Sequence, residues 1–306
     1  ERHMEALASY GVDLDRVGTN QHTWHTSVYG PAQTFLAQYD NDILWNSGSE
    51  MPCASASPQT AAENVLSLPF FLEEDGEPTM LMLNASTIYY KGEEWSDLSA
   101  KYGVPVCFYY HCDWIYKDDT EAKKVIQAMS DFLDKHGYTC ITEDQLACAS
   151  AAALNTAVTT AMDGSGAIRL SASTLRTDLA LYDENYQNSV GVKLTFGEGY
   201  SVSDYATDAS VWRQEGNSLY LSLDKDTTVW KGQREGTYLR QVNLPASLTW
   251  EGDTLTVDFA EGGLMEVQVE GSVSTPSEGW TMTREGERTT LTKRGDADTL
   301  VLHFWE

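Results

Sequence analysis

The sequence predicts an α/β region over residues 1–162, built on a parallel sheet or barrel, followed by an all-β sandwich over residues 163–306. Two observations support this. Between residues 104 and 162 the chain alternates strand, helix, strand and helix, which is typical of parallel βαβ units. After residue 163 it changes to short runs of alternating apolar and polar residues separated by glycine-containing turns, the pattern of a sandwich.

The first predicted strand covers residues 104–110, a run of valine, phenylalanine and tyrosine that is apolar on both faces. It is followed at once by His111, Asp113 and Trp114. In α/β proteins the chemistry takes place at the carboxyl ends of strands. We therefore expect a functional site here, with His111 and Asp113 as the catalytic candidates.

A helix is predicted over residues 119–136, because apolar residues recur there at three- and four-residue spacings. Acidic residues at its start and Lys135 near its end suit the helix dipole, and Gly137 suits the position after the last turn. A short strand over residues 138–142 and an alanine-rich helix over residues 143–162 complete the α/β pattern.

The second half of the chain contains runs that alternate with a period of two, as expected for strands with one buried face. The predicted strands are residues 167–170, 190–196, 218–223, 254–259, 265–269 and 299–304. The composition changes at residues 163–166, which we take as the domain boundary.

The charge of the chain excludes several partners. It has 306 residues with 20 basic and 46 acidic side chains, a net charge of −26. Such a surface does not favour nucleic acid or an anionic membrane. No apolar run approaches the roughly 18 residues of a membrane span.

The five cysteines are odd in number and form no Cys-x-x-Cys pair, which favours small buried side chains over a disulfide framework.

A second polar cluster lies near the amino terminus, where His22 and His25 flank Trp24. Imidazoles at short spacing are suited to binding zinc and other first-row metals. A His-x-x-His pattern by itself is more often part of a polar loop than a metal site. The presence of His111 downstream favours a site.

The segment from Tyr109 to Asp113, followed by the helix and by residues 135–146, resembles the closing segment of polysaccharide deacetylases. His22 to His25 resembles their metal-binding motif. The resemblance implies a distorted (β/α)7-type barrel, which could be incomplete, over residues 1–162. It also implies removal of N- or O-acetyl groups from a glycan by water activated by a divalent metal, with zinc as the expected ion.

The resemblance further implies roles for individual residues. His111 would be the general acid that protonates the leaving group, and His22 and His25 would bind the metal. Trp24 and Trp114 would provide walls against which a sugar ring stacks. A glycan is then the expected partner, and the location is expected to be extracellular or at the cell surface.

The chain departs from the family pattern in three respects. It lacks the family's pair of aspartates and its Arg-Pro-Pro segment, and the spacing of its histidines is different. Its second histidine is at i+3, where the family has i+4, and position i+4 is Thr26. We therefore expect a diverged or amino-terminally truncated member.

Two other functions stay open. A glycoside hydrolase would need two carboxyl groups facing each other across a cleft, for which Asp113 and Glu50 are candidates. Asn84 follows a predicted strand and would hydrogen-bond a sugar hydroxyl or cap a turn.

A non-catalytic carbohydrate-binding protein would instead use aromatic side chains of the second half. These are Trp212, Tyr220, Trp230, Tyr238, Trp250 and Trp280.

Overall fold

A computed structural model describes residues 2–12, 14, 17–19, 31–47, 70–74, 76–82, 86–87, 97, 108–109, 123–124, 127–128, 130–131, 133, 135 and 141–304. The chain divides into two compact units. The first comprises Glu1–Leu154 and Leu179–Leu181, and the second comprises Asn155–Asp178 and Tyr182–Glu306.

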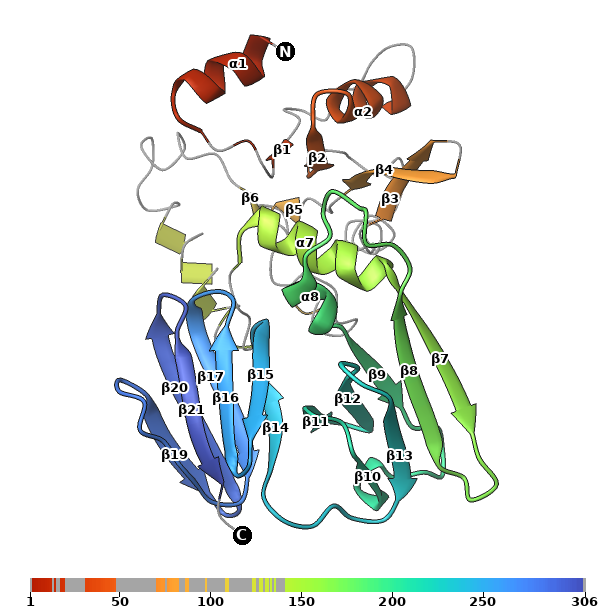
Figure 1. Cartoon of the computed structure of the whole chain (residues 1–306), viewed down its shortest axis with the longest axis vertical. Helices are drawn as coiled ribbons and strands as arrows, with labels where there is room; N and C mark the ends of the chain where they lie inside the picture. Colours follow the sequence, from red (N-terminus) through yellow and green to blue (C-terminus); the bar gives the residue numbers. More distant parts are fainter. Residues whose placement is uncertain are drawn as a thin grey trace. The chain divides into compact units, whose positions relative to one another are not determined.

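The first unit combines helices with two small sheets (Figure 1). Its elements are α1 (Arg2–Ser9), β1 (Val17–Thr19), α2 (Pro31–Tyr39), β2 (Ile43–Asn46), β3 (Phe70–Glu74), β4 (Glu77–Met82), β5 (Ser86–Thr87), β6 (Phe108–Tyr109) and α7 (Glu143–Leu154). The larger sheet has the order β1-β2-β4-β3. In it β1, β2 and β4 are parallel, whereas β3 is antiparallel to β4. The short strands β5 and β6 form a separate parallel pair.

The predicted (β/α)7-type barrel is wrong, because the described strands do not form a continuous parallel sheet that closes on itself. The reason lies in the hairpin between β3 and β4, where Gly76 has a positive φ of 82°. This hairpin places an antiparallel strand along the edge of β4. In a barrel, that edge would pair with the next parallel strand.

The helical predictions are confirmed in part. The described residues of the predicted helix over 119–136 are helical. The helix predicted over residues 143–162 is too long, because α7 ends at Leu154 and residues 156–162 form a strand. Thr156, Val158 and Thr159 are β-branched and favour an extended backbone.

The second unit is almost entirely β-structure. Its elements are β7 (Thr156–Met162), β8 (Ile168–Thr174), α8 (Glu184–Asn188), β9 (Gly191–Thr195), η3 (Val202–Asp204), β10 (Tyr205–Thr207), β11 (Trp212–Glu215), β12 (Ser218–Ser222), β13 (Thr227–Lys231), β14 (Tyr238–Val242), β15 (Ala246–Glu251), β16 (Thr254–Phe259), β17 (Gly263–Glu270), β18 (Val273–Ser274), β19 (Thr281–Glu285), β20 (Arg288–Gly295) and β21 (Thr299–Phe304). Each of the six runs predicted as strands contains or overlaps one of these.

The prediction of a single sandwich for this half is wrong, because its strands pair differently. They form four small sheets, with the orders β10-β13-β8-β7, β11-β12-β9, β14-β17-β20-β19 and β15-β16-β21-β18. Their buried faces pack into two hydrophobic cores. The alternation of residues along a strand shows that one face is buried, but it does not show which strands share a sheet.

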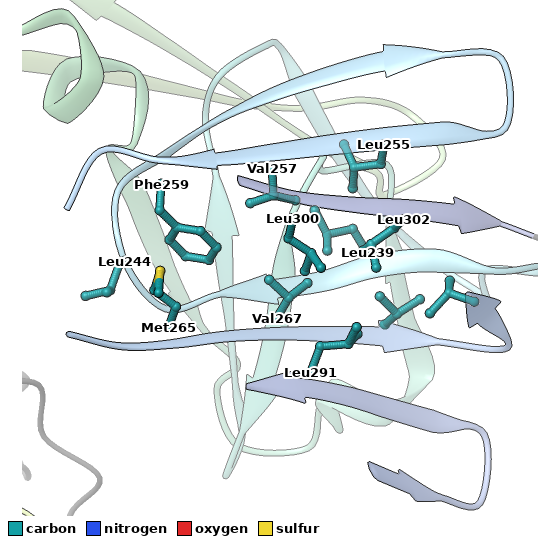
Figure 2. Close-up of a cluster of buried hydrophobic side chains, with 12 residues drawn as sticks. Leu239, Leu244, Leu255, Val257, Phe259, Met265, Val267, Leu291, Leu300 and Leu302 are labelled. Atoms are coloured by element: carbon teal, nitrogen blue, oxygen red, sulfur yellow. The ribbon is translucent and has the colours of Figure 1, made fainter. Parts of the chain in front are cut away.

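The first core lies between the sheets that contain β8 and β12. Leu170, Leu219, Leu221 and Val229 are at most 2% exposed there, and Trp212 from β11 packs with them. The second core lies between the sheets of β14 and β16 and is drawn in Figure 2. Its fully buried members include Leu255, Val257, Met265, Val267, Leu291, Leu300 and Leu302.

The composition change at residues 163–166 corresponds to the turn of the β7–β8 hairpin, which lies inside the second unit. The Asp163 carboxylate accepts hydrogen bonds from the Ser165 amide at 2.9 Å and from the Ala167 amide at 3.2 Å. Gly166 has a φ of 83°, which a residue with a side chain rarely adopts. The glycine and serine of this segment therefore close a tight hairpin.

Candidate functional site

The predicted site residues lie outside the part of the chain that the structure describes. They are His22, Trp24, His25, Glu50, Asn84, His111, Asp113 and Trp114. Their roles remain predictions. The described strands that precede them in sequence nevertheless define an edge of the sheet.

That edge is formed by the carboxyl ends of β1, β2 and β4, which are parallel neighbours. In sequence, His22 comes three residues after β1, Glu50 four residues after β2 and Asn84 two residues after β4. His111 comes two residues after β6, in the other parallel pair.

Two polar residues are completely buried at the end of β2. Asn46 and Ser47 are both 0% exposed. The Asn46 side-chain amide donates to Gln38 Oε1 at 2.9 Å, and the Ser47 amide donates to the Thr19 carbonyl at 3.0 Å. The bond from Ser47 joins the end of β2 to the end of β1, and the bond from Asn46 joins β2 to α2.

The chemistry of the available donors gives limited support to a metal site. The imidazoles of His22 and His25 are suitable zinc ligands. The described residues at this edge supply an amide and a hydroxyl but no carboxylate, and no group of three His, Cys, Asp or Glu able to hold a metal occurs among the described residues. Any further ligand would have to come from outside the described ranges.

The second unit contains a cleft of about 690 Å³ that the sequence did not reveal. Strands β9, β11 and β12 line it, together with β14, the start of β15 and α8. Its volume is within the range of small-molecule binding sites. All of its lining residues are described and belong to the second unit.

A row of charged and aromatic side chains crosses three strands along this cleft. Tyr220 on β12 is directly opposite Lys193 on β9 and Arg213 on β11. The Lys193 Nζ lies 5.3 Å from the centroid of the Tyr220 ring, and the Arg213 guanidinium carbon lies 4.3 Å from it. Cross-strand register thus brings two cations to one aromatic ring.

A second arrangement alternates cations and rings. Arg234 lies 4.6 Å from the centroid of Tyr238, whose ring stacks on Trp212 with centroids 5.8 Å apart and planes inclined by 23°. Arg240 covers Trp212 at 4.6 Å. We call Arg234, Tyr238, Trp212 and Arg240 the cation–aromatic stack. It joins β11 to β14, and two of its members, Trp212 and Arg240, line the cleft.

Arg240 reaches this position because of a β-bulge. The pairing of β14 with β17 shifts between Leu239 and Gln241, so that Arg240 is the additional residue on its strand. A bulge redirects the side chain of the extra residue. The guanidinium Nη1 donates to Glu270 Oε2 at 2.5 Å, and the two side chains are 12% and 25% exposed.

The stack changes the acid–base behaviour of its members. Burial, and then the negative charge of Glu270, raise the pKa of the Tyr238 phenol above its ordinary value of 10.0. Arg240 and Arg234 act in the opposite direction. Burial also lowers the pKa of the Arg234 guanidinium below its ordinary value.

The helix α8, which contributes Asn185 and Asn188 to the cleft, is held by buried polar contacts. Asn155 donates to the Arg176 carbonyl at 2.6 Å and to Gln187 Oε1 at 3.2 Å. The Tyr186 hydroxyl donates to Glu261 Oε2 at 2.7 Å.

Only part of the aromatic set expected for sugar binding meets at the cleft. Trp212 and Tyr220 line it, and Tyr238 stacks behind Trp212. Trp250 instead packs on Phe304 at 4.9 Å, and Trp280 stacks on Phe259 at 5.8 Å. The sequence did not identify the cations of the cleft as binding residues. Lys193 lies between Val192 and Leu194, an alternation that predicts an outward-facing side chain, and Arg213 follows Trp212. Neither local pattern shows that the two cations meet.

No family model, curated protein or solved structure matches this chain. Among the described helices, none is long and apolar enough to cross a membrane.

Proposed function

We propose that the first unit is a carbohydrate deacetylase that removes acetyl groups from a glycan. The observation that carries the proposal is the shared carboxyl edge of β1, β2 and β4. The segments that contain His22, His25, Glu50 and Asn84 begin at this edge.

The chemistry assigned to these residues follows from their types. When bound, a divalent metal would activate water and polarise the acetyl carbonyl. His22 and His25 would hold it. His111 would carry a proton and deliver it to the leaving nitrogen or oxygen, since the ordinary pKa of histidine allows both protonation states near neutral pH. Trp24 and Trp114 would orient the sugar by stacking.

Acetate release and metal content test this proposal together. The full chain is incubated with zinc and either N-acetylated chitooligosaccharides or acetylated xylan, and free acetate is measured. We expect release from at least one substrate and loss of at least about 100-fold in rate for His111→Ala, which is the usual contribution of a general acid.

His303→Gln provides the matched control. His303 lies on β21 in the second unit, where its Nδ1 is 3.0 Å from Thr254 Oγ1. This variant should retain the parent rate. Release that persists in His111→Ala would refute the assigned role. Absence of both bound metal and acetate release would refute the deacetylase proposal.

A further inference from the structure

We propose that the cleft of the second unit binds an acidic oligosaccharide, whose uronate carboxylates are held by Lys193 and Arg213. This site is separate from the proposed catalytic edge, and its binding function does not require the deacetylase activity.

The lining of the cleft carries more cations than carboxylates, whereas the chain as a whole is acidic. The lining includes three cations, Lys193, Arg213 and Arg240, and one carboxylate, Asp224, in a protein with a net charge of −26. A concentration of positive charge in such a protein attracts anionic ligands.

The three cations differ in their availability. Arg240 is committed to Glu270 and to the Trp212 ring. Lys193 is exposed, and no ion pair joins it to a carboxylate within the described ranges. Arg213 and Glu215 are 3.3 Å apart, but their side chains are 43% and 62% exposed. An exposed pair of this kind is weak and exchanges readily for a ligand carboxylate.

Tyr220 holds both available cations on the same face of the sheet. It lies between them in the cross-strand register and contacts each with its ring. Two cations so restrained lose less conformational entropy when they bind a common ligand. The row therefore supplies a preorganised anion site.

The neutral polar lining favours a saccharide over an acidic peptide. Asn185 and Asn188 lie three residues apart on α8 and are exposed, and Gln241 and Ser247 also line the cleft. Side-chain amides and hydroxyls both donate and accept hydrogen bonds. Sugar hydroxyls also do both, so that this lining can bind several of them. The combination of amides, hydroxyls and two cations fits a hydroxylated anion.

Isothermal titration calorimetry of the full chain tests the proposal, with oligogalacturonate and glucuronate-containing oligosaccharides as acidic probes. An uncharged galactan oligosaccharide of the same length and poly-glutamate are the comparison ligands. We expect at least one acidic oligosaccharide to bind at least about tenfold more tightly than either comparison ligand, and its affinity to fall as salt is raised.

The double variant Lys193→Ala with Arg213→Ala should weaken this binding by about tenfold or more. The matched double variant Lys231→Ala with Arg288→Ala removes two exposed cations of the same unit that do not line the cleft, and it should bind as the parent does. His111→Ala should also bind normally, which separates this site from the proposed catalytic function. Thermal melting of both double variants establishes that they are folded.

Three results would overturn the proposal. The first is absence of binding by both acidic oligosaccharides. The second is binding of the neutral oligosaccharide or of poly-glutamate with equal affinity, which would indicate a neutral sugar site or a peptide site. The third is equal loss of affinity in the two double variants, which would indicate only a general effect of charge.

Discussion

The guanidinium carbon of Arg240 lies 4.6 Å from the ring centroid of Trp212, and this contact joins the two β cores of the second unit. Trp212 belongs to the first core, and Arg240 follows Leu239, which belongs to the second. The bulge at Arg240 allows its side chain to meet both Trp212 and Glu270. The extra residue of β14, Arg240, thus fixes the side chains beside it in the cleft through its contacts with Trp212 and Glu270.

Replacing Arg240 with methionine should lower the free energy of unfolding by about 2 kcal/mol. The variant keeps an aliphatic side chain but leaves Glu270 without its cation, and an uncompensated, largely buried carboxylate is costly. Urea denaturation followed by tryptophan fluorescence measures the change. Arg169→Met is the control, because Arg169 is 70% exposed and 3.9 Å from Asp163, so its loss should cost less than about 0.5 kcal/mol. Equal stability of the two variants would contradict this account.

Asn155→Ala should destabilise the second unit by about 2 kcal/mol. Asn155 is 4% exposed, and its amide donates to the Arg176 carbonyl while its Oδ1 accepts from the Arg176 amide at 2.9 Å. Removal leaves buried backbone groups without partners. Thermal unfolding checks this prediction. Asn188→Ala, at an exposed position on α8, should unfold at nearly the parent temperature.

Gly18→Ala should disrupt the first unit. A Cβ at position 18 would overlap the ring atoms of Trp45, and that side chain is only 4% exposed. We expect a loss of more than about 3 kcal/mol, or failure to fold. Gly164→Ala is a suitable control, because nothing lies within 4 Å of its added methyl group. Normal stability of Gly18→Ala, measured by urea denaturation, would show that β1 and β2 do not approach as closely as described.

Asp298→Asn should make stability less dependent on pH in acid. The Lys293 ammonium donates to Asp298 Oδ2 at 2.6 Å and the Trp280 indole donates to the same oxygen at 3.0 Å, and these bonds hold the pKa of Asp298 below its ordinary value of 3.8. Because the folded-state pKa is lowered, the stabilisation is present above pH 3.8 and is lost as pH falls through the folded value.

We expect Asp298→Asn to cost about 1 kcal/mol at pH 7, since the pair is partly exposed, and the difference from the parent to shrink toward pH 2. Chemical denaturation at a series of pH values measures it. Asp296→Asn, at an exposed position nearby, is the control and should cost less than about 0.5 kcal/mol at pH 7. A difference that grew as pH fell would have the wrong sign for this explanation.

Local patterns predicted much of the secondary structure. The strands over residues 254–259 and 299–304 were predicted with the bounds that the structure has, because alternation between a buried and an exposed face is visible in the sequence. The helix predicted over residues 143–162 ends at Leu154 in the structure. The prediction gave more weight to the alanines of this segment than to the β-branched residues after Leu154, which form a strand. That strand is stabilised by its pairing with β8, which local composition does not show.

The barrel was predicted from a resemblance that covers a limited part of the chain, and the antiparallel strand β3 contradicts it. The strand order of a sheet depends on hydrogen bonds between distant segments. A hairpin closed at Gly76 changes that order without altering the helices and strands on either side.

The sequence by itself determined the acidity of the chain, the positions of most strands in its second half and the candidate histidines of its first half. Each of these depends on composition or on spacing within a few residues. Only the tertiary structure decided that Lys193, Tyr220 and Arg213 form one row and that Arg240 covers Trp212. The physical reason is that these contacts depend on strand register and on a β-bulge, which arise when separate strands pair.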